Sequence, residues 1–308
     1  MSTVSTTVAP PREAHGFTSF DYLLYAAVVL LWGTSWIALH MQLGVVAPEV
    51  SLFWRFSIAA LIMVGWVFAT GTPMRYGPGD HLRFAALGLT IFSFNFVLFY
   101  YGGLSTPSGL LAVVFSLASV FNMLLGTVFF AQRPSGRLAI AALLGFAGVG
   151  LMFAPQLAGA SFGGAAFTGL LLCIGGTVSF CLGNMVSVAN QRRGIPISAS
   201  TTWGMAWGAL FLLIFSLARG QFFIVEPTLR YLGALAWSST MASVLAFAAY
   251  MTLLRRIGAS RAGYSTVLYP VVALGVSTFA EGYVWSLTAL AGLALVIVGN
   301  LVMLARSA

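Results

Sequence analysis

The sequence predicts an all-α integral membrane protein in which ten transmembrane helices form two inverted five-helix repeats around a central cavity. Composition is the first reason: of 308 residues, 60% are hydrophobic and only 6% are charged, whereas soluble domains carry roughly 25% charged residues. Apolar runs of about 20 residues recur along the chain, the length that a helix needs to cross a bilayer. The third reason is the distribution of arginines between these runs.

Turn-like segments such as "GTPMRYGPGD", "STPSG" and "APQLAGASFGG" separate the apolar runs. The expected spans are 22–40, 50–69, 83–102, 107–131, 137–154, 165–190, 200–219, 231–254, 262–280 and 286–305. Residues 1–19 are polar and lack the apolar centre of a signal peptide. The expected divisions are a cytoplasmic tail (1–21), a first five-helix repeat (22–154), an external linker (155–164), a second inverted repeat (165–305) and a cytoplasmic C-terminus (306–308).

The arginines between the spans predict the orientation of the chain. Most of them fall on one side of the predicted membrane: Arg12, Arg75, Arg83, Arg133, Arg137, Arg192, Arg193, Arg255, Arg256, Arg261 and Arg306. Arg219 and Arg230 fall on the other side, and Arg55 lies within the second span. Because cytoplasmic loops carry the excess of basic residues, both termini are expected in the cytoplasm.

The two halves share weak sequence similarity. "LLWGTSW" in the first span matches "CIGGTVSF" in the sixth, and the fifth and tenth spans end in "GFAGVGLM" and "GLALVIVGNLVM". Since each half has an odd number of spans, the second half must enter the membrane upside down. Inverted repeats of this kind are typical of transporters, whose substrate site lies near the midplane between the halves.

The five-plus-five layout, "LLWGTSW" and "YPVVALGVSTFAEG" (269–282) together resemble the EamA-like members of the drug/metabolite transporter superfamily. The similarity is greatest to bacterial exporters of aromatic and neutral amino acids. It implies a multi-pass efflux carrier of the bacterial inner membrane. The residues themselves indicate neither the direction of transport nor the substrate.

The first span carries the clearest candidate site. Trp32, Trp36 and His40 follow one another at i, i+4 and i+8, so they share one helix face. Trp32 falls near the membrane midplane, where the interfacial aromatic belt does not explain it. This face either lines a substrate cavity, together with Ser35, or packs against other helices. Gly33 and Ser35 allow close approach of a neighbour.

Polar and aromatic side chains also gather on other predicted helices. A carrier of aromatic or medium-sized neutral solutes needs such a lining, because rings supply apolar area while hydroxyl and amide groups orient the solute. The additional substrate-binding candidates are Asn95, Phe99, Tyr100, Tyr101, Ser179, Asn184, Ser243, Phe247, Tyr250, Tyr264, Ser265 and Tyr269. Pro270 interrupts the ninth helix, either as a tolerated kink or as a hinge that exposes backbone to substrate.

Acidic residues are absent from the depths of the predicted spans, which favours facilitated transport over strict proton coupling. His40 and Glu281 lie at span ends and remain the candidates for a proton site. Arg55 lies about a turn and a half inside its span. It either extends its head to the interface or attracts a substrate carboxylate.

Several other functions are disfavoured. No buried aspartate pair, mid-span histidine, metal-ligand cluster or P-loop lysine is present in the sequence, so an intramembrane enzyme and an ATP-driven pump are not expected. Cofactors and nucleic acid are not expected either, because the arginines follow membrane topology. A ligand-binding receptor or scaffold that does not transport remains an alternative, as does a proton-coupled exporter of drugs. The expected partners are a small-molecule substrate and the lipid bilayer, with a monomer favoured.

Overall fold

A computed structural model describes residues 18–131, 136–157, 164–257, 262 and 265–304. The described residues form helices and no strands. Eight helical segments are long and apolar enough to cross a membrane, and two shorter apolar helices cover Val267–Ala280 and Leu287–Val302. These segments occupy the ten expected spans, so the prediction of an all-α membrane protein is confirmed.

The first half consists of α1 (Ser19–Gly33), α2 (Ser35–His40), α3 (Pro48–Ala69), α4 (Pro78–Leu87), η1 (Gly88–Phe94), α5 (Asn95–Gly103), α6 (Ser108–Phe115), α7 (Ala118–Phe130) and α8 (Gly136–Leu157). The second half consists of α9 (Ala165–Arg192), α10 (Ile197–Ala218), α11 (Leu229–Ala236), η2 (Trp237–Leu245), α12 (Ala246–Ile257), α14 (Ser265–Ala280) and α15 (Leu287–Leu304). The π-helical segments η1 and η2 lie in the third span of their respective halves.

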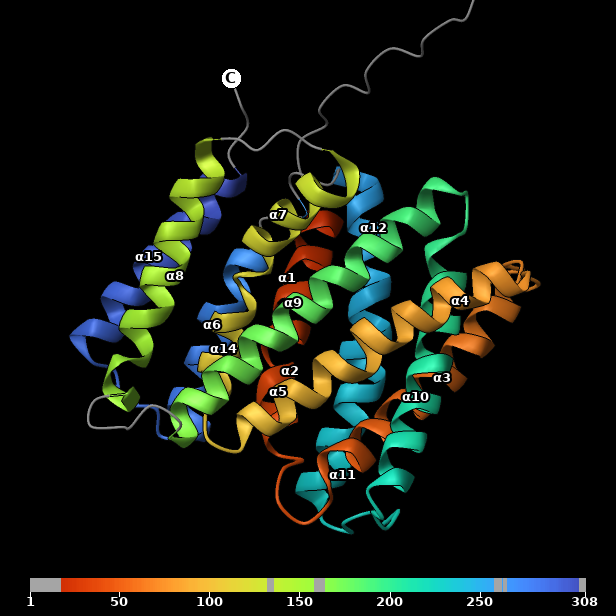
Figure 1. The fold of residues 1–308 in the computed structure, drawn as a ribbon, viewed down its shortest axis with the longest axis horizontal. Helices are drawn as coiled ribbons and strands as arrows, with labels where there is room; N and C mark the ends of the chain where they lie inside the picture. Colours follow the sequence, from red (N-terminus) through yellow and green to blue (C-terminus); the bar gives the residue numbers. More distant parts are fainter. Residues whose placement is uncertain (1–17, 132–135, 158–163, 258–261, 263–264, 305–308) are drawn as a thin grey trace, which may run out of the picture.

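The helix packing follows the two-fold relation that two repeats require (Figure 1). Equivalent helices pair with each other, namely α3 with α10, α6 with α14 and α8 with α15. Two further sets of contacts also match between the halves. The contact of α5 with α9 corresponds to that of α12 with α1, and the contact of η1 with α10 corresponds to that of η2 with α3.

Glycines let α8 and α15 pack with their backbones in contact. A Cβ on Gly148 would lie 2.6 Å from the Gly292 carbonyl oxygen, and a Cβ on Gly292 would lie 2.5 Å from that of Gly148. Gly299 lies instead against Ala141 and Gly145. The numbering rises along one helix as it falls along the other, so these equivalent helices are antiparallel, as inverted repeats require.

The bundle has two ends that differ in charge. Because successive spans run in opposite directions, most of the described arginines lie at the end of the bundle where α1 begins. We call this the arginine-rich end; it contains Arg75, Arg83, Arg192, Arg193 and Arg256. The opposite, arginine-poor end holds Arg219 and Arg230.

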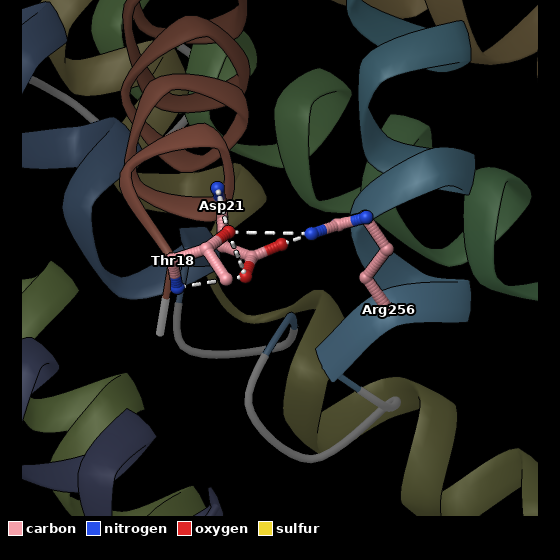
Figure 2. A network of polar contacts seen from close by, with 3 residues as sticks. All are labelled: Thr18, Asp21 and Arg256. Carbon is pink, nitrogen blue, oxygen red and sulfur yellow. Dashed lines mark hydrogen bonds and ion pairs between the residues drawn. The ribbon is translucent and has the colours of Figure 1, made fainter. Parts of the chain in front are cut away.

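At the arginine-rich end, Thr18 caps α1 and bonds Asp21, whose carboxylate is ion-paired with Arg256 of α12 (Figure 2). This contact ties the first helix to the second half of the chain.

Candidate functional site

The motif around the two tryptophans contains the break between α1 and α2. The hydroxyls of Thr34 and Ser35 each donate to a backbone carbonyl of the preceding turn at 2.7 Å. Such side-chain bonds compete with the hydrogen bonds of the helix itself. Gly33 faces α14, where a Cβ would lie 2.6 Å from Cγ1 of Val272. The motif therefore interrupts the first span and allows the ninth to approach it closely.

Trp32 joins three spans. Its ring centroid lies 5.2 Å from that of Tyr250 in α12 and 5.5 Å from that of Tyr269 in α14. Its indole N–H donates to the Ala242 carbonyl in η2 at 3.0 Å. The hydroxyls of Tyr269 and Ser265 are 2.9 Å apart. Trp32, Tyr250, Ser265 and Tyr269 are thus brought together, and the indole donor is satisfied.

Trp36 lies in a different group of rings. It is 8% exposed, and its ring centroid is 5.1 Å from that of Phe99 and 5.3 Å from that of Phe115. Phe180 of α9 extends this group, with its centroid 4.8 Å from that of Phe115. Phe115 and Phe180 were not predicted from the sequence, because nothing distinguishes them among 25 phenylalanines.

His40 lies at the arginine-poor end, beside Glu281. Its Nδ1 is 2.8 Å from the Glu281 carboxylate, which also accepts hydrogen bonds from Ser108 and Ser277. Burial raises the pKa of Glu281, but the hydrogen bonds from His40, Ser108 and Ser277 outweigh it and lower the pKa to about 2. The two residues that sequence reasoning held as candidate proton sites therefore form one pair that links α2 to the end of α14.

Tyr101 belongs to a second polar group at the same end. Its hydroxyl donates to Glu49 at 2.9 Å and accepts from Arg219, which lies 3.5 Å from that carboxylate.

Asn95 is buried, and its amide nitrogen donates to the carbonyl of Ile91. Its amide oxygen has no hydrogen-bond partner among the described residues.

The polar candidates of α9 make contacts between helices. The Ser179 hydroxyl donates to the Thr90 carbonyl in η1 at 2.8 Å. The Asn184 amide donates to the Asn122 side chain in α7 at 3.1 Å. Both side chains are therefore engaged with the first half in this conformation.

The remaining candidates lie in α12 and α14 or just before α14. Phe247 is half-buried in α12, and Pro270 is buried within α14. Tyr264 lies outside the residues that the structure describes.

Arg55 does not extend to the interface, so that expectation is wrong. The side chain is 4% exposed, with its guanidinium carbon 4.4 Å from the ring centroid of Phe96 and 5.1 Å from that of Phe56. Its Nε and Nη2 donate to the Ser243 hydroxyl in η2 at 3.4 and 3.3 Å. Neighbouring helices cover the cation before it reaches the surface.

An open groove of about 220 Å³ lies between α2, α11 and the start of η2. Its lining includes Thr34, Met41, Arg230 and Trp237, and none of the predicted site residues. Trp36, Phe99 and Tyr100 are buried. This groove does not reach these side chains, and the central cavity and its role in binding stay predictions.

The fold and the paired halves define a multi-pass membrane transporter. Residues 19–154 and 167–305 match the sequence model of the EamA-like transporter family, so the chain belongs to that family. The resemblance inferred from the sequence is confirmed.

Curated relatives have transporter names. The chain is 28% identical to "Uncharacterized transporter YvbV" of Bacillus subtilis, over 89% of this chain and 88% of the relative. It is 22% identical to "Probable amino-acid metabolite efflux pump" of Escherichia coli, over 82% and 84%. It is 24% identical to "Uncharacterized inner membrane transporter YedA" of the same species, over 82% and 80%.

A solved crystal structure superposes on this chain with a TM-score of 0.66. The two chains are 17% identical, and the match covers 93% of this chain and 96% of the other. At that identity the likeness shows the fold alone.

Proposed function

We propose that the protein is a secondary transporter that exports small neutral solutes, namely aromatic and other neutral amino acids, by alternating access. The observation that carries this proposal is the position of the α1–α2 unit. It holds the tryptophan motif and is joined to the second half at both ends, through Asp21 and Arg256 at one and through His40 and Glu281 at the other.

This arrangement suits a carrier because each end has its own separable contact. Releasing the His40–Glu281 pair frees the arginine-poor end, whereas releasing the Asp21–Arg256 pair frees the opposite end (Figure 2). With both pairs formed, the α1–α2 unit is held against the second half at both ends. Alternating access needs two contacts of this kind that open in turn around a fixed site.

The side chains around the tryptophan motif support a neutral solute with an aromatic or apolar part. Trp32, Tyr250 and Tyr269 form one aromatic wall, and Trp36 and Phe99 contribute to a second. Rings supply stacking and apolar area for such solutes. The name of the Escherichia coli relative, an amino-acid metabolite efflux pump, agrees with this substrate class.

We further propose that both termini are cytoplasmic, that the membrane is the bacterial inner membrane and that the working unit is a monomer. The arginine distribution supports the orientation. Gly204 and Gly208, the GxxxG of α10, pack on Gly88 and Phe92 of the same chain, which removes one motif for self-association. In intact cells, an impermeant thiol reagent should label Val45→Cys and not Gly79→Cys; the reverse would contradict this orientation.

The test is exchange of labelled amino acids in liposomes containing the purified protein, at equal pH and with a pH gradient. We expect exchange of phenylalanine and leucine at equal pH. Trp36→Ala should reduce phenylalanine exchange more than alanine exchange, whereas Trp66→Ala, at a side chain 48% exposed on α3, should change neither. If labelled solute binds but never crosses, the protein is a receptor or scaffold instead.

Proton-coupled export is a second candidate, which the His40–Glu281 pair favours. These are two titratable groups in direct contact, one from each half, at a contact that must open during transport. Exchange that stays at background at equal pH and appears only with a proton gradient would establish this alternative and contradict the facilitated mechanism.

A further inference from the structure

A buried polar cluster lies between the two halves, near the arginine-poor end. It consists of Gln42 just after α2, Arg55 of α3, Tyr100 of α5, and Ser238 and Ser243 of η2. Arg55 is seven residues into α3, so it lies about 10 Å along the helix from its start. All five side chains are less than one-tenth exposed.

The cation in this cluster has no anion beside it. The guanidinium of Arg55 donates to the Ser243 hydroxyl at two long distances of 3.3 and 3.4 Å, and the Tyr100 hydroxyl lies beside it without a hydrogen bond of good geometry to any described residue. The carboxylates of the described chain bond elsewhere, namely those of Asp21, Glu49, Asp80, Glu226 and Glu281. A buried charge without a counterion is destabilising, so its presence calls for a functional reason.

Two neighbouring polar atoms are also unpartnered. The Tyr100 hydroxyl is fully buried next to Arg55 and Gln42, yet it makes no hydrogen bond of acceptable geometry. The Gln42 side-chain oxygen likewise has no partner, although its nitrogen donates to the Ser238 hydroxyl at 3.0 Å and to the Ala38 carbonyl at 2.9 Å. Buried polar groups are almost always satisfied in folded proteins.

The π-helical segment η2 places Ser238 and Ser243 in this cluster. The Ser243 hydroxyl donates to the Ser238 carbonyl five residues earlier at 2.8 Å, which leaves the Ser243 oxygen facing Arg55. π-Helical turns are frequent at functional sites. The Ser238 hydroxyl accepts a hydrogen bond from the Gln42 side-chain nitrogen, so polar groups of both halves meet in this cluster.

We propose that this cluster binds the carboxylate of the transported solute, with Arg55 and Tyr100 as donors and Ser243 as their neighbour. The inference rests on the proposed function and names the chemistry of its substrate. A zwitterionic amino acid satisfies both kinds of group. Its carboxylate accepts hydrogen bonds from the Arg55 guanidinium and the Tyr100 hydroxyl, and its ammonium group donates to the Gln42 side-chain oxygen. The cluster is closed in this conformation and becomes accessible when the α1–α2 unit separates from the second half.

The test compares binding to the purified full-length protein in detergent, by calorimetry, for three probes: L-phenylalanine, L-phenylalaninamide and 3-phenylpropionate. We expect the amide, which lacks the carboxylate, to bind about tenfold to a hundredfold more weakly than phenylalanine. 3-Phenylpropionate, which lacks the ammonium group, should lie between them.

A matched pair of tyrosines separates binding from folding. Tyr100→Phe removes an unsatisfied buried hydroxyl, so the melting temperature should stay level or rise while phenylalanine affinity falls. Tyr231→Phe removes a buried hydroxyl that is bonded to Ser51 at 3.0 Å, so the melting temperature should fall while affinity is retained. Arg55→Gln should abolish the discrimination between acid and amide without loss of the folded state.

Equal affinity for phenylalanine and its amide overturns the proposal, as does unchanged affinity in Tyr100→Phe and Arg55→Gln. Absence of binding by every carboxylate probe overturns it too. Failure of this proposal and failure of the proposed function give different results. Acid-selective binding without exchange in liposomes would refute transport and leave the site, whereas exchange that does not distinguish acid from amide would refute the site and leave transport.

Discussion

Replacing Glu281 with glutamine should lower the free energy of unfolding, because it removes the ion pair with His40 at the arginine-poor end. The carboxylate is ion-paired with His40 and accepts from Ser108 and Ser277, and its side chain is 11% exposed. Its pKa is lowered from 4.5 to about 2. The fall of about 2.5 corresponds to about 3 kcal/mol in favour of the ionised folded form, at about 1.4 kcal/mol for each pKa unit. Because the folded pKa is depressed, this stabilisation is present above about pH 4.5 and is lost as the pH falls toward about 2.

The assay is the melting of wild-type and variant protein in detergent between about pH 7 and about pH 3. Glu281→Gln should melt well below wild type at neutral pH, and the two curves should converge as the pH falls through the window. Glu226→Gln is the matched control, because that carboxylate bonds only to the Thr228 hydroxyl among the described residues. The reasoning would be refuted if the free energies of unfolding of wild type and Glu281→Gln differed by less than about 0.5 kcal/mol at neutral pH. It would also be refuted if this difference did not shrink on acidification.

Three further predictions concern packing, the tryptophan motif and the arginine-rich end. Gly148→Ala should lower the melting temperature, because its Cβ would meet the Gly292 backbone at 2.6 Å, whereas Gly150→Ala, with open space around it, should not; equal melting would contradict the close approach of α8 and α15. Trp32→Phe keeps an aromatic ring but loses part of the ring area and the indole hydrogen bond to η2, so a loss of at least about 1 kcal/mol is expected in melting experiments, and an unchanged value would argue against that bond. Asp21→Asn should lower the melting temperature by breaking the ion pair with Arg256 at the arginine-rich end; unaltered melting would mean that this contact does not hold that end together.

The spans could be predicted from the sequence because hydropathy and helix length determine them almost alone. The interruptions could not. The break at Thr34 and the π-helical turns of η1 and η2 depend on which carbonyl each N–H and hydroxyl finds after packing. Apolar periodicity is nearly the same on either side of such a turn, so it contains no signal for it.

The candidate site, too, could be predicted from the sequence only in part. Trp32, Tyr250, Ser265 and Tyr269 were predicted from their helical spacing, and the structure brings them together. The burial of Arg55 could not be predicted, because position along a helix does not reveal that other helices cover its head. The Trp32, Trp36 and His40 face was expected as one surface, but the break after Gly33 gives each of these side chains different neighbours.

Separation of the α1–α2 unit from the second half, at one end and then the other, is the central claim, and a distance across the arginine-poor end measures it most directly. Spin labels at Val45 and Val284, both exposed at that end, can be followed by double electron–electron resonance in liposomes, with Cys173 and Cys181 replaced by alanine. We expect a closed and an open distance population whose ratio changes when phenylalanine is added, with Glu281→Gln shifting the ratio toward the open one. A single distance, unchanged by phenylalanine and by the substitution, would contradict alternating access in this protein.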